Sequence, residues 1–182
     1  MKKISLVVVG LATIGVLGLG QSAQAEETTA KEEETTAQVK VNSGGITISK
    51  TSNITFEDVT IAKGGSTATE KDKSSVTIED LRGSSSKGWT LTAKLKDKNF
   101  DGMNLNVKPK IESNAGVATA GSETILNSDP QTIATVADAD IKTTEYDTKV
   151  SLNATLDVPD RQLENTYTTT IVWNLAEGPG TK

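Results

Sequence analysis

Cysteine and histidine are both absent from the 182-residue sequence. Without cysteine the protein can form no disulfide bond, so its hydrophobic core alone must hold the fold, in contrast to the stapled scaffolds of many small secreted proteins. Without histidine, the Ser-His-Asp and Cys-His nucleophile systems and the usual zinc sites are excluded. Most common hydrolase mechanisms are therefore ruled out.

Aromatic residues and positive charge are also scarce. The sequence holds two Trp, two Tyr and two Phe, too few to line a large substrate cleft as well as a core. Its 24 acidic residues against 19 basic ones give a net charge of −5, which offers no basic groove for nucleic acid. A wall glycosidase that uses two carboxylates stays a distant alternative, because no spacing selects a pair of acids. We expect a protein that is not an enzyme and binds no cofactor and no nucleic acid.

The first 25 residues have the pattern of a signal peptide. Two lysines precede an apolar run at residues 4–19, and Ala23-Gln24-Ala25 offers a small-x-small cleavage site directly before polar chain. An uncleaved membrane helix is the alternative, but the short run and its flanks disfavour it. Cleavage leaves 157 residues, enough for one domain, with 17 basic and 24 acidic side chains and a net charge of −7.

Residues 26–38, EETTAKEEETTAQ, have no apolar period and no large side chain. Such a segment cannot offset its ordering entropy by burial. Its imperfect EETTA repeat is compatible with a helix or a docking tail, but we favour a flexible acidic linker. The folded domain is then expected at residues 39–182.

From residue 39 onward apolar and polar residues alternate with a period of two, the pattern of strands that bury one face. We expect strands at residues 46–48, 54–56, 76–78, 89–95, 103–107, 150–158 and 167–175. Glycine pairs and prolines separate them, and no stretch keeps a helical apolar stripe for three turns. The pattern predicts one all-β domain, an antiparallel β-sandwich or a related open barrel with roughly eight to eleven strands. Weak alternation in residues 112–147 predicts a long excursion or short irregular strands there.

Two segments repeat a Trp-x-Leu motif, Trp89-x-Leu91 and Trp173-x-Leu175, and they contain both tryptophans of the chain. Residues two apart share a face of a strand, so each tryptophan stands beside its leucine. In the second segment Tyr167 lines the same face. Both motifs are therefore expected on strands.

With their flanks, these motifs resemble the WxL-domain surface proteins of Gram-positive bacteria. Residues 80–83 (DLRG) with 88–93 (GWTLTA) are similar to the first block of that family. Residues 167–179 (YTTTIVWNLAEGP) are similar to its closing block, with Pro179 four residues past the leucine. The resemblance covers nearly the whole chain after the linker.

The resemblance implies a small single-domain protein, secreted and held at the cell surface by non-covalent binding to the cell wall, through peptidoglycan or another wall polymer. It also implies complexes with other WxL proteins and with a membrane-anchored WxL-interacting protein. The segment 178–182 (GPGTK) fits this expectation, because it shows no LPxTG-like sorting signal and no second apolar run. The alternative is a structural or adhesive subunit that binds host matrix and is retained through the membrane-anchored partner.

The motif residues Trp89, Leu91, Trp173 and Leu175 are the first candidates for a binding surface, because an aromatic face stacks on sugar rings and anchors interfaces. Their alternation with other apolar residues favours the opposite interpretation, in which both tryptophans pack in the core. The resemblance marks the motif and does not show that its residues touch a ligand.

Asp80, Arg82 and Tyr167 are secondary candidates. Asp80 and Arg82 project to one side of a strand end beside a glycine-flanked loop, where they could recognise a polar wall component. A local ion pair or loop clamp is the favoured interpretation of these two charges. Asp138 and Asp140 lack the spaced oxygen ligands of a calcium loop, so we expect no metal site.

Overall fold

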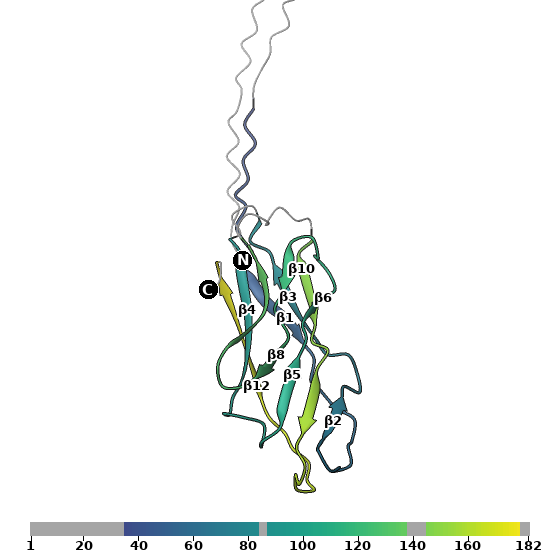
Figure 1. Cartoon of the computed structure of the whole chain (residues 1–182). Helices are drawn as coiled ribbons and strands as arrows, with labels where there is room; N and C mark the ends of the chain where they lie inside the picture. The colour runs from purple at the N-terminus through teal and green to yellow at the C-terminus, as the bar shows by residue number, and fades with distance from the viewer. Residues whose placement is uncertain (1–34, 84–86, 138–144, 179–182) are drawn as a thin grey trace, which may run out of the picture. The chain divides into compact units, whose positions relative to one another are not determined.

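The computed structural model describes residues 35–83, 87–137 and 145–178. The chain divides into two units, Met1–Val39 and Lys40–Lys182, and the second unit contains every described strand. Within the described ranges, no helix has the length and apolar character needed to cross a membrane. The twelve strands found there (Figure 1) are β1 (Ile46–Thr51), β2 (Ser66–Thr69), β3 (Ser75–Asp80), β4 (Trp89–Leu95), β5 (Asn104–Val107), β6 (Lys110–Ile111), β7 (Ala118–Ala120), β8 (Thr124–Leu126), β9 (Gln131–Val136), β10 (Asp147–Ser151), β11 (Thr155–Val158) and β12 (Ile171–Glu177).

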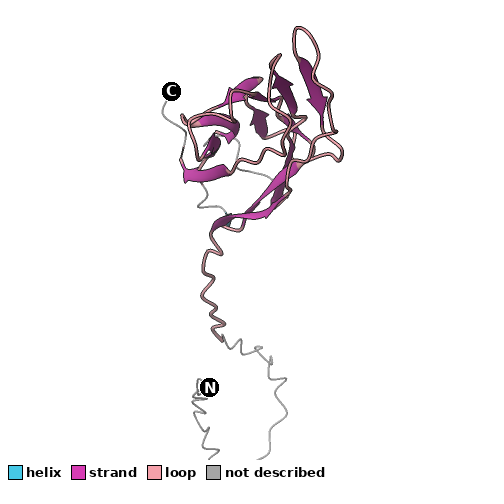
Figure 2. Ribbon diagram, turned by 90° about the horizontal axis from the view of Figure 1, so that it is seen from below, coloured by secondary structure: helices cyan, strands magenta, loops and turns pink. Residues whose placement is uncertain are grey.

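The strands form three four-stranded antiparallel sheets, in the orders β1-β3-β10-β6, β2-β11-β5-β8 and β12-β4-β9-β7. Each sheet contributes buried aliphatic side chains to one core cluster, for example Ile78, Leu105 and Leu91. Figure 2 shows the strands of these sheets from below. The expected all-β, one-domain architecture is confirmed, with one strand more than the expected range among the described residues.

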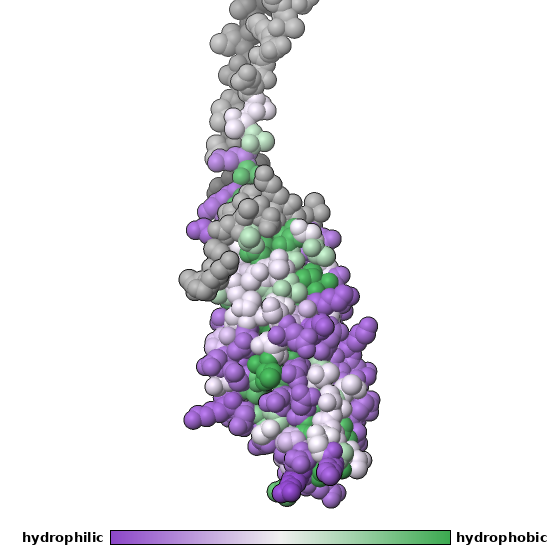
Figure 3. Space-filling model, viewed as in Figure 1, coloured by the Kyte–Doolittle hydropathy of each residue, from purple (hydrophilic) through white to green (hydrophobic). Residues whose placement is uncertain are grey.

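Alternation along the strands separates the core from the surface, as the sequence indicates. In β4, Leu91, Ala93 and Leu95 are all at most 1% exposed, while Thr92 and Lys94 on the other face are half-buried. The face of the molecule seen in Figure 3 is mostly hydrophilic, and apolar residues appear there in small separate patches. In β4 the apolar side chains therefore face the interior of the domain.

The single strand expected at residues 150–158 is wrong. Asn153 has a φ of 45°, in the left-handed region, and it divides the segment into β10 and β11, which belong to different sheets. The Asn153 side-chain amide donates to the Lys108 carbonyl at 3.0 Å, which holds the bend. Leu152 and Ala154 on either side stay buried, so the apolar alternation continues across the break and hides it.

Two further expected strands need correction. Residues 54–56 form a single bridge from Phe56 to Glu70 rather than a strand. The last strand begins at Ile171, four residues after Tyr167, because the ladder with β4 starts at the Ile171–Leu95 pair. The Tyr167 hydroxyl lies in the preceding segment and donates to the Leu163 carbonyl at 2.7 Å.

In residues 112–147, the expectation of short strands is right for β7 and β8 and wrong for β9, a six-residue strand between β4 and β7. The register shifts between the pairs Leu91–Ala134 and Thr92–Thr132, which leaves Ile133 as an extra residue, a bulge in β9. Neighbouring Ile133 and Ala134 are therefore both buried, which breaks the alternation that the sequence analysis relied on.

Residues 1–25 and 26–34 lie outside the described residues. The signal peptide and most of the acidic linker therefore stay predictions.

Candidate functional site

The two Trp-x-Leu motifs lie on neighbouring antiparallel strands, β4 and β12. Leu91 pairs with Leu175, and the tryptophans flank this pair, with Trp89 opposite Glu177 and Trp173 opposite Ala93. Directly opposed residues of an antiparallel pair share a face, so both tryptophans and both leucines point toward the core side of the sheet. The structure thus joins two motifs that are 84 residues apart in the sequence into one ladder.

The two motifs differ in burial. Trp89 is 2% exposed and Leu91 is fully buried, because β4 lies between β12 and β9. Trp173 and Leu175 are half-buried and pack against the same core from β12, the outermost strand of the sheet. Core packing, the favoured interpretation, therefore describes Trp89 fully and Trp173 in part. A side chain as buried as Trp89 has no face left for a ligand, whereas Trp173 keeps one.

Asp80 and Arg82 form the ion pair and loop clamp that the sequence favoured. Arg82 Nε donates to Asp80 Oδ1 at 2.9 Å and Nη2 donates to Asp80 Oδ2 at 2.8 Å, a bidentate arrangement. The same Nη2 donates to the Lys87 carbonyl at 2.7 Å, and Nη1 lies 3.7 Å from Glu177 Oε2. Arg82 is only 7% exposed. It therefore ties together the end of β3, the close of the loop after Gly83, and the end of β12.

Tyr167 is half-buried against the core and precedes β12. Its hydroxyl is engaged by the Leu163 carbonyl, so its contact serves the local turn. The sheet side of the candidate set thus consists of a buried scaffold, with Trp173 and Leu175 as its partly exposed members.

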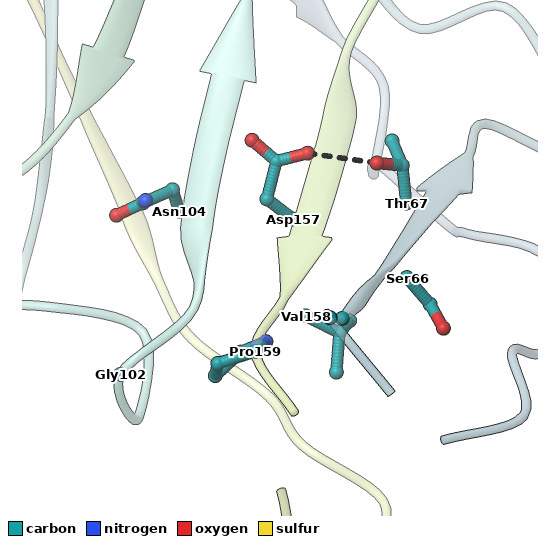
Figure 4. Close-up of a pocket in the computed structure, with 9 residues that line it drawn as sticks. Ser66, Thr67, Gly102, Asn104, Asp157, Val158 and Pro159 are labelled. Atoms are coloured by element: carbon teal, nitrogen blue, oxygen red, sulfur yellow. Dashed lines mark hydrogen bonds between the residues drawn. The ribbon is translucent and has the colours of Figure 1, made fainter. Parts of the chain in front are cut away.

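A polar hollow of about 380 Å³ opens where β2, β11 and the start of β5 meet (Figure 4). Its lining is mostly small or polar, with two apolar members at the end of β11: Gly64, Gly65, Ser66, Thr67, Gly102, Asn104, Asp157, Val158 and Pro159. The sequence analysis missed it, because the lining comes from three separate segments. Gly64, Gly65 and Pro159 belong to the glycine pairs and prolines that the sequence analysis interpreted as breaks between strands.

Asp157 is the carboxylate of this hollow, and it is held in place from both sides. The Thr67 hydroxyl donates to Asp157 Oδ1 at 3.0 Å (Figure 4), and the Asn106 amide donates to Asp157 Oδ2 at 2.8 Å. The strand register brings these side chains together: Asp157 pairs with Thr67 on β2 and with Asn104 on β5, and Asn106 lies two residues along β5 on the same face as Asn104. A hollow with a fixed carboxylate, an amide and hydroxyls suits a ligand rich in hydrogen-bond donors and acceptors.

Gly65 forms part of the wall of this hollow for a steric reason. Its φ is 88°, and a Cβ placed on it would lie 2.8 Å from the Val158 carbonyl oxygen. A larger residue would be strained in that conformation and would push against β11. Gly65 therefore lets the chain approach β11 closely at the rim.

No group of three or more metal-ligating side chains is assembled among the residues that the structure describes. Asp138 and Asp140 lie outside those residues. Away from the hollow, Glu112 Oε1 accepts hydrogen bonds from Ser151 Oγ at 2.8 Å and from Lys110 Nζ at 3.2 Å. The Ser151 hydrogen bond, with the Lys110 ammonium next, lowers the pKa of the Glu112 carboxyl below its usual value.

These features define an all-β module whose paired Trp-x-Leu strands build one sheet and whose polar hollow opens on another. A family model described as WxL domain surface cell wall-binding matches residues 23–179. The chain therefore belongs to the WxL family, and it is a cell wall-binding domain of the cell surface. No curated protein sequence matches it.

Proposed function

We propose that this protein is a non-catalytic module that attaches non-covalently to peptidoglycan and assembles there with other surface proteins. Residues 1–25 direct its export, and the acidic linker at residues 26–38 spaces the domain from its surroundings. The observation that carries the proposal is the WxL match over residues 23–179. Partners of the assembly are other WxL proteins and a membrane-anchored WxL-interacting protein.

The polar hollow is the wall-polymer contact in this proposal. Peptidoglycan presents sugar hydroxyls, acetamide groups and peptide amides, which are hydrogen-bond donors and acceptors. Asp157 accepts from such donors, the Asn104 amide can donate and accept, and the Thr67 hydroxyl, whose hydrogen is donated to Asp157, can accept. Pro159 at the edge offers a small apolar wall to an acetamide methyl group. The glycines leave the backbone open to close approach.

Trp89 and Leu91 act in this proposal by building the sheet, and so do Asp80, Arg82 and Tyr167. Their buried or engaged side chains support a fold-holding role. Trp173 and Leu175 have exposed area on β12 and are the motif residues that contact a partner.

Co-sedimentation of the mature protein, residues 26–182, with purified peptidoglycan tests the proposal. We expect the protein in the pellet, and we expect Asp157→Asn to move most of it to the supernatant. Asp72→Asn makes the same chemical change at an exposed position outside the hollow, and it should leave binding unchanged. If the wild-type protein stays in the supernatant and instead coats a surface of host matrix, the adhesive alternative replaces wall binding.

A further inference from the structure

In strand β12, the backbone N–H and C=O groups of the second Trp-x-Leu motif, Trp173 and Leu175, point away from the neighbouring strand β4. The Lys96 N–H donates to the Thr170 carbonyl at 2.8 Å, and the Gly178 N–H donates to the Gly88 carbonyl, so these two pairs bracket the β4–β12 ladder. In an antiparallel ladder every second pair is hydrogen-bonded. The even-numbered residues of β12 therefore bond to β4. The N–H and C=O groups that point away from β4 belong to Ile171, Trp173, Leu175 and Glu177.

The rest of the ladder agrees with this assignment. The Leu95 N–H donates to the Asn127 carbonyl at 2.7 Å, so an odd-numbered residue of β4 directs its N–H away from β12. β12 is placed at the end of its sheet, and β4 is the strand with which it pairs among the described residues. A row of backbone donors and acceptors is thus left along the outer side of the second motif.

This edge differs from the other sheet edges of the described domain. β2, β6, β7 and β8 are edge strands of two to four residues, and β1 is interrupted by a register shift between Ile48 and Lys50. Short edges, bulges, lysines and prolines are the usual protection against pairing with another chain. β12 runs for seven residues in unbroken register and contains no lysine, arginine or proline. β12 therefore lacks these protective features and can pair with a further strand.

β12 presents partly exposed apolar side chains on both faces of the sheet. Ile171, Trp173 and Leu175 are half-buried on the core face, and Val172 on the outer face is 38% exposed. A strand added beside β12 would place its own side chains next to these residues and cover part of their exposed area. When a strand adds to a sheet edge, main-chain hydrogen bonds and contacts of alternate side chains together hold it there.

We propose that this edge pairs with β12 of a second copy of the chain, in an antiparallel, two-fold symmetric dimer. A two-fold axis at Asn174 places Trp173 opposite Leu175 of the second copy, and Ile171 opposite Glu177 of the second copy. In this register the outward-pointing residues of each strand meet one another, as hydrogen-bonded pairs require. On the outer face Val172 meets Ala176 of the second copy, and Asn174 meets its own counterpart.

Charge supports the second copy as the occupant. Glu177 is the one ionisable residue in β12, and the Asn174-centred register sets it opposite an isoleucine, so no two like charges face each other. The pairing joins two four-stranded sheets into one continuous sheet across the dimer. It supplies a surface for the assembly part of the proposed function and does not depend on peptidoglycan binding.

Opposed charges at the two-fold axis test the register. Asn174 is exposed, so Asn174→Lys and Asn174→Asp should fold, as unfolding curves will verify. Sedimentation velocity of the mature protein, from micromolar to several hundred micromolar, should show a concentration-dependent dimer. Each variant alone should be monomeric, because like charges meet at the axis, and an equimolar mixture of the two should recover the dimer. Thr47→Lys, at an exposed position on edge strand β1, is the matched control and should dimerise like the wild type.

A wild-type protein that stays monomeric over this range overturns the proposal, as do folded Asn174 variants that dimerise like the wild type. A mixture of the two variants that stays monomeric rules out the Asn174-centred pairing. Both Asn174 variants should still pellet with peptidoglycan. Asn174 variants that lose the dimer and still bind peptidoglycan would show that dimerisation and wall binding are tested independently.

Discussion

Leu91 lies directly opposite Leu175 in the β4–β12 ladder. Each leucine is the last residue of a Trp-x-Leu motif, so the pairing makes the two motifs neighbours across adjacent strands. Trp89 and Trp173 then lie at opposite ends of the shared leucine pair. The repeat of the motif in the sequence corresponds to the antiparallel symmetry of this strand pair, and both copies are needed to complete one apolar ladder.

Truncation of the two tryptophans should affect stability unequally. Trp89→Ala should reduce the free energy of unfolding by about 3 to 5 kcal/mol, the usual cost of emptying a fully buried aromatic site. Trp173→Ala should cost clearly less, because its side chain is half-buried at the sheet edge. Urea unfolding followed by circular dichroism measures both. Equal losses would show that the edge position does not reduce the contribution of Trp173.

Removal of Arg82 should destabilise the fold strongly. Arg82→Ala leaves the Asp80 carboxylate without its bidentate partner and releases the Lys87 carbonyl, and breaking a buried pair in this way costs about 3 to 5 kcal/mol. Arg82→Lys should recover part of this, because lysine keeps the charge and loses the planar fork. Lys108→Ala is the control, since its pair with Glu123 is exposed and should contribute about 1 kcal/mol or less. If the Arg82 and Lys108 variants unfold at the same urea concentration, the clamp does not hold the fold.

Asn153 should tolerate glycine better than alanine. Its φ of 45° costs an ordinary L-residue about 1 to 2 kcal/mol, so Asn153→Ala pays this and also loses the hydrogen bond to the Lys108 carbonyl. Asn153→Gly loses the hydrogen bond and keeps the conformation. Thermal unfolding should rank wild type above the glycine variant and the glycine variant above alanine. A more stable alanine variant would mean that the bend between β10 and β11 is not left-handed in solution.

Glu112 should titrate below its ordinary value of 4.5 in the folded protein, chiefly because of the Ser151 hydrogen bond and then because of Lys110. A lowered folded-state pKa contributes stability above the unfolded-state pKa, and this contribution is lost as the pH falls through the folded-state pKa. Ser151→Ala should therefore raise the pKa of Glu112, and Glu112→Gln should flatten the acid side of the stability curve. Carboxyl NMR titration measures the first effect. An unchanged pKa in Ser151→Ala would contradict the assigned cause.

Much of the fold follows from the alternation of side chains. The strands at residues 76–78 and 89–95 were predictable because their apolar residues recur at every second position and pack on one core. The break at Asn153 was not predictable from that pattern, since the residues on both sides stay buried in two different sheets. The bulge at Ile133 in β9 hid a central strand for a related reason, because it buries Ile133 and Ala134 in succession.

The candidate site divides in the same way. Each Trp-x-Leu motif and the Asp80–Arg82 pair could be predicted from the sequence, because each lies within three consecutive residues. The different exposure of Trp89 and Trp173 depends on which strand is the edge of the sheet, and only the topology decides that. The polar hollow joins residues near positions 65, 104 and 157, which no local spacing connects.

Extraction of intact cells tests the central claim, non-covalent attachment to the wall, most directly. Cells are treated with concentrated salt or chaotrope without muramidase, and the intact mass of the released protein is measured. We expect release of an unmodified chain that begins at Glu26. Release that requires wall digestion, and that yields protein joined covalently to peptidoglycan fragments, would contradict the account.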